Sequence, residues 1–504
     1  MGLLPGIVCP AVVCGPAPGH RDAAPALVLA LALAGSVIAG SWLFQPGPEI
    51  NTRNSYEDVD TGGLPELRSR NGLLEITLIA APMRVHIGGV SFAGAAYNGI
   101  YGGPVLRLHA GDLLRLHLIN HMADAINLHF HGLRVPPTGR ADNMHILVQA
   151  GGHFDYEIRI PRSHPPGLFW YHDHAAGAAE PHVTAGLSGA LLIDGFTAQF
   201  GGLAGVPQKL IVLKDWADPD CPPGELQTKL HCRIVSINGA ADWRDQMTPN
   251  SMQLWRVSNQ GSNLVLHLVA PGLEFRPIGR DGVPANDGVI TDTLDIMPAS
   301  RVDVLVRAPK QGIFSLAAIG VPTGRGASFT IRRTLGQISV AGAAAPPGPP
   351  LVLPHMADLR DQPVQAKRVI VFAQNKNATQ YTVNGKMFDP ARTDLRVPIG
   401  TVEEWTIQNV TPDFHEFHIH QLGFQLTEIN HIEQNFSGYI DDVRVPEHGE
   451  VKLLIPFTDP LILGHVMFHC HVLNHEDRGM MATLEIFQPG LLHICRLPAA
   501  GAIK

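Results

Sequence analysis

HCHVLNHEDRGMM, at residues 469–481, places three histidines, one cysteine and two methionines in one short stretch. In an extended strand successive side chains face opposite sides, so His469 and His471 point one way and Cys470 points the other. One such strand can supply ligands to two metal sites. A blue-copper site uses two histidines, one cysteine and a weak axial methionine, and the stretch offers most of this set: Cys470, His475 and Met480. We expect electron transfer between two metal environments.

Three further segments carry histidines in alternation, HFH at 129–131, HDH at 172–174 and HEFHIH at 415–420. His415 has the opposite parity to the pair that follows it, so we assign it to the cysteine site. The four segments present eight same-face histidines: His129, His131, His172, His174, His418, His420, His469 and His471. A single His-x-His pair is more often a solvated strand edge. Eight imidazoles, however, exceed the four ligands of a structural zinc and predict a cluster of several metal ions.

The order of these motifs resembles that of a known family. The copper-binding signature of the multicopper oxidases, the laccase-like family, is similar to four motifs of this chain: HFHG (129–132), WYHDH (170–174), HEFHIH (415–420) and HCHVLNHEDRGMM (469–481). The resemblance extends from about Glu49 to Phe487 and is nearest to three-domain bacterial members, the copper-efflux and spore-coat laccase types. It implies an all-β fold of three consecutive cupredoxin-like Greek-key β-barrels after an N-terminal hydrophobic segment.

The resemblance also implies four copper ions, one of type 1, one of type 2 and two of type 3. The type 1 ligands would be His415, Cys470, His475 and Met480. The type 2 ligands would be His129 and His418. One type 3 ion would bind His131, His172 and His471, and the other would bind His174, His420 and His469. In the family, a donor gives single electrons to the type 1 copper, and four electrons reduce O₂ to water at the other three ions.

Two carboxylates match positions where the resemblance implies proton-relay acids. Glu476 follows His475 directly, and Asp142 lies in GRADN after the first histidine pair. Reducing O₂ consumes protons, and carboxylates near a metal cluster are suitable relays because charge and hydrogen bonds adjust their acidity. From the residues alone, a surface carboxylate is the more common interpretation of each. The resemblance favours a catalytic role for both.

Three copies of one sequence unit divide the chain. Each begins with an Asn-Gly pair, typical of a tight turn, and continues into a strand of alternating apolar residues. Together with breaks in composition, the repeat predicts cupredoxin domains at 49–198, 199–345 and 346–504. The middle copy keeps only His267, which we expect not to be a ligand. The cluster should form between the first and third domains, with the middle domain as a spacer and partial wall.

Length, charge and the N-terminal region limit the number of domains, the partners and the location of the protein. The 504 residues suit three domains, and a net charge of −8 without a basic run argues against a nucleic-acid partner. Residues 1–48 belong to no repeat, and their apolar run at 23–44 predicts a signal peptide or an uncleaved membrane anchor. The catalytic part should then be extracytoplasmic, periplasmic or secreted. There Cys221 and Cys232 would form a disulfide or stay as two thiols.

The electron donor is the least determined part of the function. The third domain has only scattered methionines, Met356, Met387 and Met467, before the cysteine site. Cuprous-ion binding would favour a cluster of soft thioethers. We therefore expect laccase-like oxidation of phenols or aromatic amines near His475, with O₂ as the acceptor. The alternatives are a cuprous or other metal-ion oxidase in copper tolerance, and a non-catalytic copper-binding or structural envelope protein.

Overall fold

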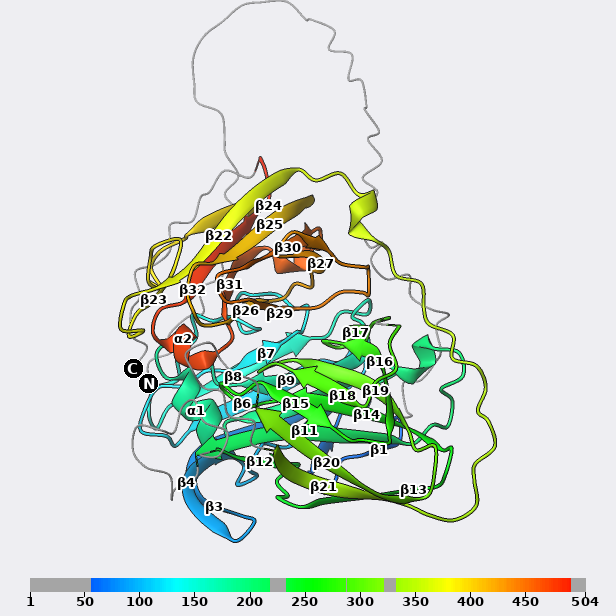
Figure 1. The fold of residues 1–504 in the computed structure, drawn as a ribbon. Helices are drawn as coiled ribbons and strands as arrows, with labels where there is room; N and C mark the ends of the chain where they lie inside the picture. The colour runs from blue at the N-terminus through cyan, green and yellow to red at the C-terminus, as the bar shows by residue number, and fades with distance from the viewer. Residues whose placement is uncertain (1–55, 218–232, 287, 321–331, 491–504) are drawn as a thin grey trace, which may run out of the picture. The chain divides into compact units, whose positions relative to one another are not determined.

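Strands dominate the structure (Figure 1). The computed structural model describes residues 56–217, 233–286, 288–320 and 332–490. Within these ranges the chain forms six β-sheets, so the predicted all-β fold is confirmed. The short helices among the described residues are α1 (Ala179–Ala185), α2 (Leu473–Asp477) and the 3-10 helices η1 (Thr197–Gln199), η3 (Leu359–Asp361) and η4 (Pro460–Ile462).

Three sequence predictions fall outside the described residues. They concern the N-terminal segment 1–48, its apolar run 23–44 and the pair Cys221 and Cys232. In the part of the chain that the structure describes, no helix has both the length and the apolar character needed to cross a membrane.

The first two sheets come from the N-terminal third of the chain. One has the order β4 (Val90–Tyr97), β3 (Leu73–Ile87), β6 (Leu113–Asn120) and β8 (His153–Arg159). The other has the order β2 (Glu66–Arg68), β5 (Val105–Leu108), β10 (Ser188–Ile193), β9 (Gly167–His172) and β7 (His129–His131). The histidine motifs 129–131 and 172–174 thus lie at one edge of the second of these sheets.

The middle of the chain forms the next two sheets. The larger has the order β1 (Val59–Asp60), β11 (Gln208–Ala217), β14 (Met252–Asn259), β19 (Arg301–Arg307), β16 (Glu274–Arg280) and β17 (Val283–Pro284), with β12 (Arg233–Ile237) also paired to β11. The smaller has the order β13 (Trp243–Met247), β21 (Arg332–Val340), β20 (Gly312–Gly320), β15 (Leu266–Val269) and β18 (Thr293–Ile296). Because β1 pairs with β11, a short segment of the predicted first domain joins the middle sheet.

The C-terminal third forms the last two sheets. One has the order β23 (Tyr381–Val383), β22 (Ala366–Gln374), β25 (Thr401–Asn409), β30 (Glu450–Phe457), β27 (Gln425–Ile429) and β28 (Ile432–Glu433). The other has the order β24 (Leu395–Pro398), β32 (Met481–Phe487), β31 (Gly464–Cys470), β26 (His415–Ile419) and β29 (Asp442–Val445). The remaining two histidine motifs meet on the neighbouring strands β26 and β31.

Each pair of sheets encloses its own hydrophobic core. In β6, Leu114, Leu116 and Leu118 are buried on one face and Arg115 is exposed on the other. Burying a leucine side chain contributes about 1.5–3 kcal/mol, so this alternation fixes which face of the strand turns inward. Three separate cores agree with three domains, whose boundaries stay a prediction.

Asparagines at equivalent places explain the sequence repeat. Asn98, Asn238 and Asn384 have φ angles of 55°, 51° and 50° and precede glycines that also have positive φ, as the predicted Asn-Gly turns require. Each Oδ1 atom accepts a backbone N–H from a neighbouring strand, at 2.8, 2.7 and 2.8 Å. The repeat therefore preserves one turn that is hydrogen-bonded to the strand beside it.

Candidate metal centre

Two strand pairs carry histidines in matching register. In the first, β7 pairs with β9 so that His129 lies opposite His172. In the second, β26 pairs with β31 so that His418 lies opposite His469. Side chains at paired positions of neighbouring strands share one face of a sheet. Each strand pair therefore presents its histidines together, as the sequence pattern predicts.

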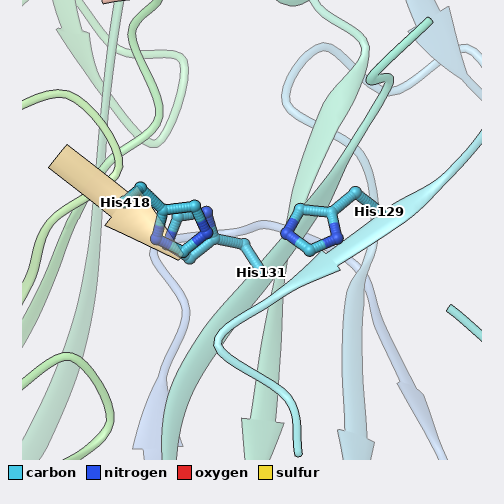
Figure 2. A group of neighbouring side chains, drawn as sticks. All are labelled: His129, His131 and His418. Atoms are coloured by element: carbon cyan, nitrogen blue, oxygen red, sulfur yellow. The ribbon is translucent and has the colours of Figure 1, made fainter. Parts of the chain in front are cut away.

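The two histidine-bearing faces meet at stacked imidazole rings. Figure 2 shows His131 and His418 overlapping, with His129 beside them. The ring centroids of His131 and His418 are 3.9 Å apart, with an angle of 17° between the planes. The rings of His129 and His420 are 3.8 Å apart at 16°. All four side chains are fully buried, so strands from the two ends of the chain enclose one histidine cluster.

Groups of three imidazoles within this cluster converge on common points. His174 Nε2 and His420 Nε2 lie 3.2 and 3.1 Å from His469 Nε2. A metal about 2.0–2.1 Å from each imidazole nitrogen would keep such nitrogens roughly 3.3 Å apart. Two further groups have ring nitrogens within 4.8 Å of one another: His131, His172 and His471, and His129, His131 and His418.

Hydrogen bonds at the edge of the cluster determine which nitrogen faces inward. His129 donates from Nδ1 to Asp142 and His418 from Nδ1 to the carbonyl of Asp441, and each leaves Nε2 buried without a partner among the described residues. His131 uses Nε2 toward Asp441 and leaves Nδ1 buried. A neutral imidazole has one N–H and one lone pair, so these bonds direct lone pairs into the cluster. Buried, unpartnered nitrogens are the donor set that copper accepts.

Burial lowers the pKa of several cluster imidazoles and so favours their neutral form, which is the form that binds metal. It lowers the pKa of His469 to about 3 and that of His174 to about 3, with Glu476 opposing the shift at His174. The pKa of His131 is also far below its ordinary value, because burial is reinforced by the neighbouring His418. These three imidazoles can thus accept a cation without first losing a proton.

The cysteine group lies on the opposite side of the same strand. Cys470 Sγ is 3.5 Å from His415 Nδ1 and 3.6 Å from His475 Nδ1, and these two nitrogens are 3.1 Å apart. The sulfur also accepts the backbone N–H of Glu416 at 3.4 Å. Burial raises the pKa of the thiol, so a nearby cation is needed to hold it as a thiolate. This arrangement fits one metal ion bound by sulfur and two imidazoles.

The turn containing α2 brings Met480 back to the cysteine group. Its carbonyl accepts the N–H of Cys470 at 3.1 Å, and its own N–H donates to the carbonyl of His475 at 3.1 Å. Met480 is fully buried. Tyr381 of β23 covers His475, with ring centroids 4.3 Å apart at 24°. His475 is the one partly exposed member of the group formed with His415 and Cys470.

Both predicted acids are buried against the cluster and not at the surface. Asp142 accepts from His129 Nδ1 at 3.0 Å and from Gln421 Nε2 at 2.6 Å. Glu476 Oε2 lies 2.9 Å from His469 Nδ1, and its Oε1 lies 3.5 Å from His174 Nδ1. Burial raises the pKa of Glu476 to about 7, so this side chain can hold or release a proton near neutral pH.

Two further carboxylates at the cluster have no counterpart in the sequence predictions. Asp441, which precedes β29, contacts His131 and His418. Glu416 is fully buried, and burial together with Asp442 raises its pKa far above the ordinary value. The parity of HEFHIH could have indicated Glu416, because it lies two residues before His418. No local pattern marks Asp441, because it reaches His131 across 310 residues.

The histidine kept in the middle repeat is absent from the described metal-binding groups. His267 Nδ1 is paired with Asp295 Oδ1 at 2.5 Å on the neighbouring strand β18, and its side chain is 31% exposed. A partly exposed hydrogen bond to Asp295 accounts for this histidine.

Family models place the chain in one protein class. Three models described as multicopper oxidase match residues 82–197, 170–343 and 361–488. The chain belongs to the multicopper oxidase family. Membership implies copper binding and oxidoreductase activity with O₂, which agrees with the two groups of buried ligand atoms.

Curated relatives share most of the chain at low identity. The multicopper oxidase mco of Staphylococcus haemolyticus is 24% identical over 432 residues, which cover 83% of this chain and 90% of the relative. The cell division protein FtsP of Edwardsiella tarda is 26% identical over 453 residues, which cover 84% of this chain and 92% of FtsP. Relatives of this chain therefore include proteins named for an oxidase and for cell division.

Solved structures have the same architecture. A multicopper oxidase from Campylobacter jejuni, described as a metallo-oxidase, has a TM-score of 0.73 at 24% identity, covering 88% of this chain and 99% of that one. The laccase-like CueO of the lignin-degrading bacterium Ochrobactrum sp., described as oxidising lignin model compounds and lignosulfonate, has a TM-score of 0.69 at 26% identity, covering 84% and 99%. The predicted cupredoxin-like fold is confirmed.

Proposed function

We propose that this protein couples one-electron oxidation of phenolic or aromatic donors to four-electron reduction of O₂ to water. The observation that carries the proposal is the use of one strand for two groups of ligands. Cys470 belongs to the cysteine group, while His469 and His471, its neighbours in sequence, belong to the histidine cluster. A short path of covalent bonds therefore joins the two.

The proposed copper ligands follow the groups that the side chains form. His415, Cys470, His475 and Met480 would hold the type 1 ion, and His129 and His418 the type 2 ion. The two type 3 ions would be held by His131, His172 and His471 and by His174, His420 and His469. Unpartnered buried nitrogens and low imidazole pKa values support this assignment. Copper, when bound, supplies the one-electron redox chemistry and the reduction of O₂.

Protein side chains provide proton supply and orientation. Glu476 lies within hydrogen-bonding distance of His469 and has a pKa of about 7, which suits a group that delivers protons near neutral pH. Asp142 accepts the Nδ1 proton of His129 and so fixes which nitrogen of that ring faces inward. We assign proton delivery to Glu476, and we assign to Asp142 a proton-relay role at the type 2 position.

The surroundings of His475 favour an aromatic donor. Tyr381, which is buried, stacks on the ring of His475, and a phenol would approach the exposed part of the His475 ring. Of the three scattered methionines, Met387 packs against Gly479 beside the cysteine group and is 41% exposed. Met467 is buried on β31, and Met356 lies against Gly438. A single exposed thioether gives weak support to a cuprous-ion site, which stays the second candidate because a structural neighbour is described as a metallo-oxidase.

A non-catalytic role is the alternative of another class, and likeness to FtsP motivates it. A protein that only assembles with partners has no need for eight buried imidazoles beside a buried cysteine, since unpartnered buried nitrogens destabilise the fold. The complete set therefore supports an enzyme. The apolar run at residues 23–44 supports a location outside the cytoplasm, periplasmic or secreted, with membrane association if the run is retained.

Oxygen uptake by the copper-loaded protein tests the proposed function. The donors to compare are dimethoxyphenol and cuprous ion. Rapid uptake with the phenol is the expected result. Uptake with cuprous ion alone would replace the proposal by metal-ion oxidation. A copper-loaded protein that consumes no O₂ with either donor would favour the copper-binding or structural role.

A further inference from the structure

One arginine of the middle sheet reaches the histidine cluster. Arg301 begins β19 and is fully buried. Its Nη1 and Nη2 donate to the two carboxylate oxygens of Asp441, at 2.9 and 2.5 Å. The guanidinium also donates to the carbonyls of Ala299, at 3.1 Å from Nη1, and Leu168, at 3.5 Å from Nε. Arg301 thus ties together segments from all three predicted domains.

Asp441 in turn contacts two histidines of the cluster. Its Oδ1 lies 3.2 Å from His131 Nε2, and its backbone carbonyl accepts from His418 Nδ1 at 2.7 Å. These contacts occupy the outward nitrogen of each ring, and the inward nitrogen has no partner in the described part of the chain. The same pair of rings is stacked 3.9 Å apart (Figure 2). A shift of Asp441 would therefore reorient both imidazoles at once.

We propose that Arg301 is a positioning residue for the histidine cluster, which it organises by holding Asp441 against His131 and His418. The inference rests on the proposed function, because it takes these two histidines to be ligands of a type 3 and a type 2 copper. It also gives the middle domain a part in the metal centre, although none of the proposed ligands comes from that domain.

The charges around Asp441 explain why a guanidinium is needed. Asp281 Oδ1 and Asp442 Oδ2 lie 3.7 and 3.8 Å from Arg301 Nη1, and Asp281 Oδ2 accepts the backbone N–H of Asp441 at 3.2 Å. Three acidic side chains thus surround one buried cation. Without Arg301, carboxylate repulsion and unpaired buried charge would displace Asp441. A lysine keeps the charge but cannot hold both oxygens of a carboxylate in one plane.

The glycine of HFHG leaves room for this ion pair. A Cβ atom at Gly132 would lie 2.6 Å from Arg301 Nη2 and 2.9 Å from Asp441 Oδ2, and the φ angle of Gly132 is +83°. Any side chain there would collide with both partners and would strain the backbone. Gly132, which follows the first histidine pair, therefore leaves the space that the guanidinium of Arg301 occupies.

The test compares Arg301→Lys with Arg256→Lys in the copper-loaded full chain. Arg256 is a matched control because its Nε is 2.6 Å from Asp303 Oδ1, both residues are fully buried, and its ion pair lies in the same sheet. We expect Arg301→Lys to weaken copper binding at the cluster about 10- to 100-fold, the usual effect of losing a group that orients a ligand. The blue absorption should be retained, the type 2 paramagnetic resonance signal should be altered or lost, and Arg256→Lys should change neither.

A second variant covers the case in which Arg301→Lys does not fold. Asp441→Asn keeps an oxygen near His131 but removes the ion pair, so it should alter the type 2 signal and retain the blue absorption. Unchanged cluster copper and type 2 signal in either folded variant would overturn the inference, as would equal losses in Arg256→Lys. If the unmutated chain binds no cluster copper, the proposed function fails first, and the inference fails with it.

Discussion

The cysteine group and the histidine cluster share strand β31, yet their surroundings differ. The ligand atoms of the cysteine group contact one another and a backbone N–H, and the Thr411 hydroxyl contacts the outer nitrogen of His415. Three carboxylates contact histidines of the cluster: Asp142, Asp441 and Glu476. A centre that only passes electrons needs fixed ligands, whereas a centre that reduces O₂ also needs protons. The carboxylates that contact the cluster histidines fit this division of work.

The two groups also differ in how far apart their members lie in the sequence. Within the cysteine group, the sulfur of Cys470 reaches histidines 55 and 5 residues away. Within the cluster, His174 and His469 meet across 295 residues. One group is complete when the C-terminal sheets form, while the other also requires the first domain to dock. The cluster should therefore be the more sensitive of the two to changes at domain contacts.

The largest effect is expected when the sulfur ligand is replaced, because this change should affect the cysteine group and spare the cluster. Cys470→Ser should abolish the intense blue thiolate-to-copper absorption and keep copper at the cluster, because no cluster histidine is changed. Absorption spectra and copper content per chain measure the two effects. Met467→Leu is the control, since Met467 is buried on the same strand but outside both groups. A serine variant that stays blue would rule out the assignment of Cys470.

Removing the acid at the cluster should slow turnover without removing metal. Glu476→Gln should lower the rate of O₂ reduction about 100-fold, within the range expected for a lost proton donor, while copper content is unchanged. Asp477→Asn is the control, because Asp477 accepts backbone N–H groups of α1, from Ala179 and Glu180. Equal rates in the Gln variant and the parent would exclude Glu476 from proton delivery.

The same acid gives a pH test in the metal-free protein. Burial raises the pKa of Glu476 from 4.5 to about 7. Between these two pH values, the folded protein keeps a proton on Glu476 that the unfolded protein has lost. Its contribution to stability is therefore present below pH 4.5 and lost as the pH rises through about 7. Glu476→Gln should gain stability relative to the parent over this window, by up to roughly 3 kcal/mol. Urea unfolding at several pH values measures it, and a gap that stays constant with pH would contradict it.

The smallest effect is expected at the covering tyrosine. Tyr381→Leu removes an aromatic stack on His475 that contributes about 0.5–1.5 kcal/mol, and it should raise the KM for a phenol a few-fold. Cluster copper should not change, because the ring of Tyr381 packs against His415 and His475 of the cysteine group. Tyr381→Phe keeps the stack and serves as the control. An equal KM in the Leu variant would remove Tyr381 from donor binding.

Strand alternation predicted more of the site than of its surroundings. It placed Cys470 opposite His469 and His471, and it separated His415 from His418, because side-chain direction in a strand depends on local geometry alone. It did not indicate which ring nitrogens face inward, since Asp142 and Asp441 determine this through tertiary contacts. The parallel pairing of β1 with β11 was also missed, because nothing in a two-residue strand marks its partner.

The long sequence separations within the cluster determine when it can form during biosynthesis. Chains are made from the N-terminus, and early domains generally fold first. All three described groups of cluster histidines include a residue at or beyond His418, so no group is complete while that part of the chain is unmade. A product that ends early can have a folded first domain and still lack every metal-binding group of the described structure. Premature termination would thus yield chains that sequester no copper in these groups and generate no partly reduced oxygen there.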